Sequence, residues 1–142
     1  MTLALAISSC TPTPEPISYG SDMCQFCKMT IVDQQHASEL VTKKGKVFKF
    51  DAIECMLNFT KESDESSFAF QLVNVYDSPK ELISAEESYF LISQSIPSPM
   101  GAFLTAFKNK KTAIEYQTTK GGEVFSWDSL QDHHESLGLN DY

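Results

Sequence analysis

Residues 45–51 read Gly-Lys-Val-Phe-Lys-Phe-Asp, and residues 122–128 read Gly-Glu-Val-Phe-Ser-Trp-Asp. The two segments share their glycine, valine, phenylalanine and aspartate, and Trp127 stands where the first segment has Phe50. In each, a glycine turn leads into alternating apolar residues, which is typical of the second strand of a hairpin. The match predicts a duplicated unit in which each copy is a hairpin followed by a short helix.

The residues upstream extend the pattern. Ala37-Ser-Glu-Leu40 precedes the first segment and Ala113-Ile-Glu-Tyr116 precedes the second, so we expect both to lie in the first strand of a hairpin. Asp51 and Asp128 then follow the second strands, and we interpret them as helix N-caps rather than catalytic acids.

Alternating apolar residues elsewhere in the chain predict the remaining strands of two similar units. Apolar alternation predicts further strands over residues 24–33, 68–76 and 87–94. The predicted fold class is α+β, with two small ββαβ units packed together, because neither alone buries enough surface to be stable. We place the first unit at residues 19–80 and the second at 81–142.

Composition narrows the functional classes. The chain has 142 residues and a formal charge of −8, with 11 Lys and Arg against 19 Asp and Glu. Such a surface repels phosphate backbones, so nucleic acid is not an expected partner. No apolar run approaches the roughly 20 residues of a membrane-spanning helix. The sequence also shows no nucleophile paired with a base, so we do not expect an enzyme.

The N-terminus is typical of an exported lipoprotein. Residues 1–9 read Met-Thr-Leu-Ala-Leu-Ala-Ile-Ser-Ser, a short signal segment, and the Ile7-Ser-Ser-Cys10 string fits the site at which Cys10 would be lipidated. Residues 10–18 would form a proline-rich tether. We therefore expect a lipoprotein that is anchored to a membrane and faces the periplasm. An incidental cysteine in a disordered N-terminus is the alternative.

Soft ligands concentrate in residues 23–29, which read Met-Cys-Gln-Phe-Cys-Lys-Met. Thiols and thioethers are polarisable donors that select Cu(I) over hard ions. Side chains alternate in a strand, so an extended segment would direct Cys27 and Met29 to one face. The cluster predicts a Cu(I) site at Cys27 and Met29, supported by Cys24 and Met23.

Three other interpretations of this cluster stay open. Cys24 and Cys27 could form a structural or redox-active disulfide, since such pairs are often oxidised in exported proteins. The pair could be half of a zinc site, although no second half is evident. The methionines could be ordinary core residues.

Elsewhere, a few side chains are secondary candidates for the site. His36 could supply a nitrogen ligand, and Met100 could approach the site from the second unit. Cys55 we interpret as a small buried hydrophobe.

Taken with these motifs, the sequence resembles the NosL family of nitrous oxide reductase accessory proteins. The resemblance spans about Tyr19 to Leu130 and rests on these residues: Asp22-Met23-Cys24-x-x-Cys27-x-Met29-x-Ile31, His36-Ala37, Phe50-Asp51, Pro99-Met100-Gly101, Ala106-Phe107, Gly121-Gly122 and Asp128. It implies a lipoprotein that binds one Cu(I) and supplies copper to the reductase apo-protein. It also implies two ββαβ units like those of the organomercurial lyase fold. The ligands it implies are Cys27 and Met29 first, then Cys24 and Met23.

Overall fold

A computed structural model describes residues 11–61 and 63–136 of the chain. The predicted signal segment and the predicted lipidation site at Cys10 lie outside these residues. Among the residues described, no helix has the length and apolar character that a membrane crossing requires.

The first half contains the predicted hairpin and helix. Strand β1 (Ser38–Thr42) pairs antiparallel with β2 (Val47–Phe50), with Leu40 opposite Phe48. Helix α1 (Ile53–Thr60) follows, then a short 3₁₀ turn (Glu65–Ser67) and strand β3 (Phe68–Val75), which pairs with the other edge of β1. Strand β4 (Ser78–Ser84), which the sequence did not indicate, completes a sheet of order β2-β1-β3-β4.

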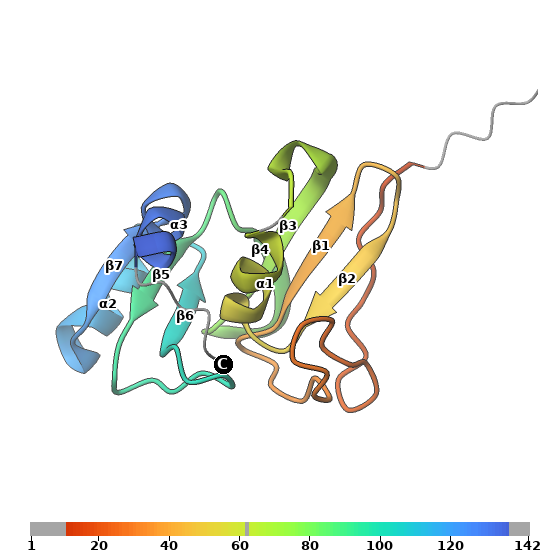
Figure 1. Ribbon diagram of the computed structural model, residues 1–142. Helices are drawn as coiled ribbons and strands as arrows, with labels where there is room; N and C mark the ends of the chain where they lie inside the picture. Colours follow the sequence, from red (N-terminus) through yellow and green to blue (C-terminus); the bar gives the residue numbers. More distant parts are fainter. Residues whose placement is uncertain (1–10, 62, 137–142) are drawn as a thin grey trace, which may run out of the picture.

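The second half forms its own antiparallel sheet. Strands β5 (Tyr89–Ile92), β6 (Leu104–Phe107) and β7 (Glu123–Ser126) lie in the order β6-β5-β7. Helix α2 (Lys110–Lys120) connects β6 to β7, and helix α3 (Trp127–Ser136) follows β7. Figure 1 shows the two sheets side by side with α1 between them.

The predicted α+β fold with two ββαβ units is confirmed, but the internal alignment is wrong. The order β2-β1-β3 of the first sheet corresponds to β6-β5-β7 of the second. The strand equivalent to β2 is therefore β6, whereas the matching heptads lie on β2 and β7. Both heptads are a strand that leads into a helix, yet they occupy different places in their units.

The predicted second hairpin does not exist because its first strand is a helix. Ala113–Tyr116 lies within α2. The Asn109 side chain caps that helix by accepting a hydrogen bond from the Thr112 amide at 3.0 Å, and Gly121 ends it with a φ of 72°. Asn109 and Gly121, at the two ends, thus favour a helix over the strand that the short apolar pattern between them predicted.

Both helix caps predicted at aspartate are wrong. The N-cap residue of α1 is Ala52, which makes no side-chain cap bond, and Asp51 lies one residue before it. Helix α3 begins at Trp127, so Asp128 is already in its first turn. At this helix start, the Ser126 amide donates to the Ser129 hydroxyl at 2.9 Å. In return, the Ser129 amide donates to the Ser126 hydroxyl at 3.3 Å.

The larger of two buried hydrophobic clusters is shared by both units. Phe50, Ile53 and Met56 of the first unit belong to the same buried cluster as Phe90 and Trp127 of the second. The sheets also meet through the backbone, where the Tyr76 amide donates to the Ala106 carbonyl at 3.0 Å. The second unit therefore packs against the side of the first sheet that carries α1.

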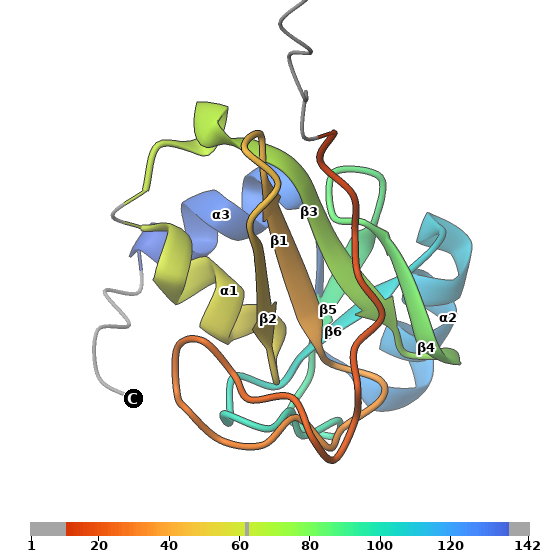
Figure 2. The same ribbon diagram turned by 90° about the vertical axis from the view of Figure 1, so that its right-hand side faces the viewer.

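The segment before the first sheet covers its other face. The Glu15 amide donates to the buried Glu39 carboxylate of β1 at 2.9 Å, and the Tyr19 hydroxyl donates to Asn74 of β3 at 3.0 Å. Ile17 is buried. Figure 2 shows this segment running along the sheet from one end to the loop at the other. The final residues of the predicted tether are thus packed against the domain.

Gly122 is where the second sheet leaves least room. It has a φ of 98°, and a Cβ atom there would collide with the carbonyl oxygen of Ile92 on β5. Gly121 has a similar φ of 72° but open space around it. We expect Gly121→Ala to cost about 1–2 kcal/mol from backbone strain. Gly122→Ala should cost about 1–3 kcal/mol more, because the strand must shift. Equal losses in chemical denaturation would contradict this packing.

Candidate metal centre

The segment that carries the sulfur motif is a loop, so the predicted strand over 24–33 is wrong. It makes one isolated antiparallel bridge between Met23 and Thr30, and the chain turns between them. The Cys24 amide donates to the Met29 carbonyl at 2.8 Å, and the Lys28 amide donates to the Cys24 carbonyl at 3.0 Å. Lys28 has a φ of 65°, which an extended strand does not allow. Strand alternation therefore gives no basis for placing Cys27 and Met29 on one face.

This loop is fixed to the edge of the first sheet through Lys49 of β2. The Gln25 amide donates to the Lys49 carbonyl at 2.8 Å. The Lys49 ammonium lies 2.8 Å from the Asp22 carboxylate, which also accepts from the Ser18 amide at 2.8 Å. The N-terminal part of the loop is therefore held against β2.

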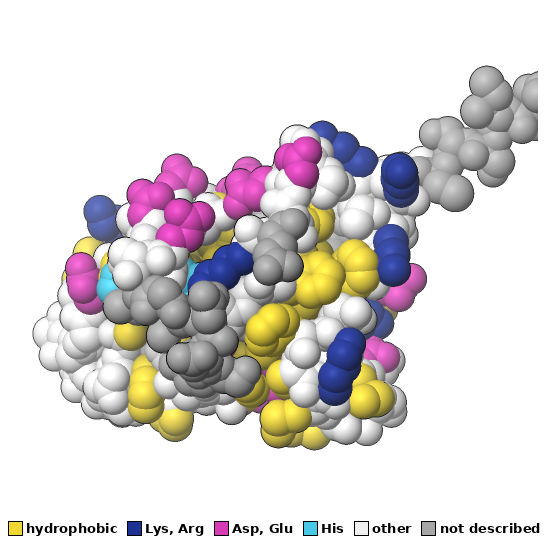
Figure 3. Space-filling view, viewed as in Figure 1, with side chains coloured by type: hydrophobic (Ala, Val, Ile, Leu, Met, Phe, Trp, Pro, Cys, Tyr) yellow, Lys and Arg dark blue, Asp and Glu magenta, His cyan; other side chains and the backbone are white. Residues whose placement is uncertain are grey.

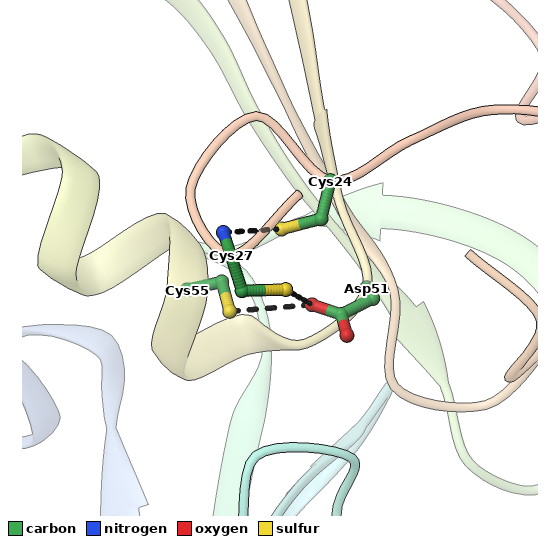
Figure 4. Close-up of side chains that lie close together, drawn as sticks. All are labelled: Cys24, Cys27, Asp51 and Cys55. Atoms are coloured by element: carbon green, nitrogen blue, oxygen red, sulfur yellow. Dashed lines mark hydrogen bonds between the residues drawn. The ribbon is translucent and has the colours of Figure 1, made fainter. Parts of the chain in front are cut away.

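Four ligand atoms converge where the loop meets the start of α1. The Sγ atoms of Cys24, Cys27 and Cys55 and a carboxylate oxygen of Asp51 all lie within 4.8 Å of one another. Cys24, Asp51 and Cys55 are buried, and Cys27 is half-buried. Figure 4 shows Cys24 and Cys27 on the loop, Asp51 after β2 and Cys55 on α1, with their side chains directed toward one another. We call these four residues the cysteine cluster.

Asp51 organises the thiols by accepting hydrogen bonds from two of them. Its Oδ1 accepts from Cys55 Sγ at 3.2 Å and from Cys27 Sγ at 3.3 Å. Cys55 lies four residues after Asp51, and the α1 backbone between them begins at Ile53. Cys24 Sγ accepts from the Cys27 amide at 3.5 Å. Each thiol thus has a polar partner inside the cluster.

The pKa values of the three thiols are shifted in different directions within the cluster. The Cys55 thiol proton, shared between Asp51 and Cys24 Sγ, lowers the pKa of Cys24 to about 6 with the aid of backbone amides. Burial raises the pKa of Cys27 to about 12. The hydrogen bond to Cys24 and burial raise the pKa of Cys55 as well. Of the three cysteines, Cys24 is therefore the one whose thiolate form the cluster favours.

The predicted ligands fall into two groups in the structure. Cys24 and Cys27 belong to the cysteine cluster, whereas Met23 and Met29 lie on the same loop with side chains 59% and 55% exposed. Ligation by these thioethers stays a prediction. Met100 packs against the core as a partly buried side chain.

His36 does not join the cysteine cluster. It is buried, with Nδ1 3.0 Å from the Asp33 carboxylate and Nε2 3.4 Å from the Thr105 hydroxyl of β6. Both ring nitrogens are thus engaged within the protein. As placed, the histidine connects the loop after the sulfur motif to the second sheet, and its role as a ligand stays a prediction.

Sequence reasoning missed Asp51 and Cys55 as members of the site. Asp51 was interpreted as a helix cap and Cys55 as a core residue, and the structure places both in the cysteine cluster. The four-residue spacing between them is no reliable signal, because Asp51 lies before an extended Ala52 and α1 begins only at Ile53. Their approach to Cys24 and Cys27 comes only from the packing of the loop against α1.

The donor set suits a soft or borderline cation. Three thiols are the ligands preferred by Cu(I), and a thiol-rich tetrahedral set also suits zinc. Hard ions such as Mg²⁺ and Ca²⁺ prefer oxygen ligands, of which the cluster offers one carboxylate. The half-buried Cys27 leaves the site reachable from the loop side.

The profile of the NosL family matches residues 18–134. The chain belongs to the NosL family. The NosL match includes both ββαβ units and all four residues of the cysteine cluster.

Among solved structures, the NosL fold is matched by the crystal structure of the copper chaperone NosL from Shewanella denitrificans. The TM-score is 0.70 with 22% sequence identity, over 83% of this chain and 94% of that one. Curated protein sequences give no match to this NosL chain.

The ionisation of Cys24 can be followed by the ultraviolet absorbance of thiolates. In the reduced, metal-free protein, one thiolate should appear with a midpoint near pH 6. Cys24→Ser should remove that step. Cys55→Ala should raise the midpoint, because the thiolate loses its largest stabilising hydrogen bond. Cys10→Ser should leave the titration below neutral pH unchanged. A step that survives in Cys24→Ser would assign the thiolate to another residue.

Proposed function

We propose that this protein is a Cu(I) carrier that holds one ion at the cysteine cluster and passes it by ligand exchange to copper-free nitrous oxide reductase. The convergence of three thiols from two separate segments supports the proposal most directly, since their Sγ atoms and the Asp51 carboxylate lie within 4.8 Å. The similar crystal structure is that of a copper chaperone, which supports the same cargo.

Binding would proceed from the thiolate already present. Cys24, with its pKa near 6, is ready to coordinate at neutral pH. Cys27 and Cys55 would lose their protons as the ion binds, so their hydrogen bonds to Asp51 would give way to sulfur–copper bonds. Asp51 would then remain beside the site as a positioning carboxylate or a fourth ligand.

Release of Cu(I) requires that an incoming ligand can reach the ion, and the exposed loop allows this. Cys27 is half-buried, and Met23 and Met29 stand exposed on the same loop. Cu(I) accepts soft ligands readily, so incoming sulfur or imidazole donors could replace the thiols one at a time. A carrier of this kind requires no catalytic residue. Lipidation at Cys10 would hold it at a membrane, on the periplasmic side.

The ligand assignment is tested by anaerobic titration against a competing Cu(I) chelator. The reduced protein should bind one Cu(I) per chain. Cys24→Ser, Cys27→Ser and Cys55→Ser should each weaken binding by more than about 100-fold, beyond the loss typical of changes outside the ligand shell. Met29→Ala should weaken it less. Cys10→Ser is the matched control and should retain wild-type affinity.

Asp51→Asn is the finer probe of the same cluster. It should weaken Cu(I) binding by about 10- to 100-fold. Asp33→Asn, on a carboxylate that binds His36 instead, should leave Cu(I) affinity unchanged. Full affinity in Cys55→Ser together with Asp51→Asn would show that the ion is held elsewhere.

A thiol–disulfide redox protein is the second candidate function. The low pKa of Cys24 favours it, because a reactive thiolate is what such proteins require. Against it, the Cys24 side chain is fully buried, out of reach of a protein disulfide.

An insulin reduction assay separates the two functions. For a copper carrier, the rate with the reduced protein should not exceed that of free dithiothreitol alone. Turnover that depends on both Cys24 and Cys27 would favour the redox function instead.

A further inference from the structure

Exposed apolar side chains gather on the loop that carries the cysteine cluster. Among the residues described, six large apolar side chains are exposed, and four of them lie within residues 23–32: Met23 59%, Phe26 37%, Met29 55% and Val32 67%. The other two, Phe70 on β3 and Ile114 on α2, are 39% and 43% exposed and lie on different elements. We call the four side chains on the loop the rim.

The rim is poor in charge compared with the rest of the protein. Residues 23–32 contain one charged side chain, Lys28, in a chain with a formal charge of −8. The Lys28 ammonium donates to the Gln25 carbonyl within the same loop. In Figure 3, acidic side chains gather on the upper part of the face shown, and hydrophobic ones appear at the lower right, where Figure 1 draws this loop. Methionine and aromatic side chains with few charges are typical of the centre of a protein–protein interface.

The size of the rim argues for brief contact with a different protein rather than a permanent dimer. The four side chains expose on the order of 400 Å² together, the size of a functional patch on a monomer. A pair of such patches would bury roughly 800 Å², below the ~1,200 Å² of stable complexes. A strongly negative protein with one rim cation is also a poor match for anionic lipid headgroups.

From this we infer that Met23, Phe26, Met29 and Val32 form the surface on which a copper-exchange partner docks. The inference rests on the proposed carrier function and names where that exchange occurs. The partner should present its own copper ligands within an apolar, weakly charged face. Contact at the rim would bring those ligands to Cys27, the half-buried member of the cysteine cluster, while excluding water from the exchange.

A double variant without any change of sulfur tests the surface. Phe26→Ser with Val32→Ser removes apolar area from the rim, and Phe70→Ser with Ile114→Ser is the matched control on other elements. Both variants should keep wild-type Cu(I) affinity and should lose copper to a small-molecule chelator at wild-type rates. Transfer to copper-free nitrous oxide reductase should slow at least 10-fold in the rim variant and stay within 2-fold of wild type in the control.

The outcomes distinguish this inference from the function on which it rests. Wild-type protein that binds Cu(I) but delivers none to the reductase would overturn both. Delivery by wild type and rim variant at equal rates would overturn the docking surface alone. A dimer seen by light scattering, or binding to anionic vesicles, that the rim variant abolishes would assign the surface to a second copy or to a membrane and overturn the inference.

Discussion

Lys49 holds together the three parts of the chain on which the site depends. Its ammonium lies 2.8 Å from the Asp22 carboxylate and donates to the Pro16 carbonyl at 2.9 Å. Its backbone carbonyl accepts the Gln25 amide while its own strand pairs with β1. The N-terminal segment, the sulfur-bearing loop and the first sheet therefore share one residue. This anchor acts together with the burial of Cys24 and Ile31 in the core, which also holds the loop against the start of α1.

Features that depend on residues close together in the sequence could be predicted, whereas those that depend on distant residues could not. The hairpin of β1 and β2 and the helix after it depend on neighbouring residues, and alternation and turn chemistry indicated them correctly. Cys24 and Cys27 were identifiable as candidates because only two residues separate them in the sequence. Cys55 was not, since it reaches them only when the loop packs against α1. The loop itself was mistaken for a strand because its alternating residues conceal the left-handed turn at Lys28.

The two ββαβ units share an architecture but differ in role: the first carries the cysteine cluster, and the second supports α1. The sequence match between β2 and β7 reflects a shared need for a strand that leads directly into a helix, rather than equivalent positions. All cysteines of the described chain lie in the first unit, and the second carries none. The second unit instead supports α1 from outside the site, where Ser98 donates to the buried Glu54 carboxylate at 2.6 Å. It contributes none of the four side chains of the cysteine cluster.

The packed N-terminal segment limits how far the domain can travel from an anchor. Because Glu15 is already bonded to β1, only five peptide units separate Cys10 from the folded body, a reach of at most about 18 Å. Figure 2 places the start of the described chain at one end of the first sheet and the sulfur-bearing loop at the other. A lipid at Cys10 would thus confine the protein to a thin layer beside the bilayer, tethered at the end of the first sheet opposite the sulfur-bearing loop. Encounter with a membrane-associated partner would then become a two-dimensional search at high effective concentration.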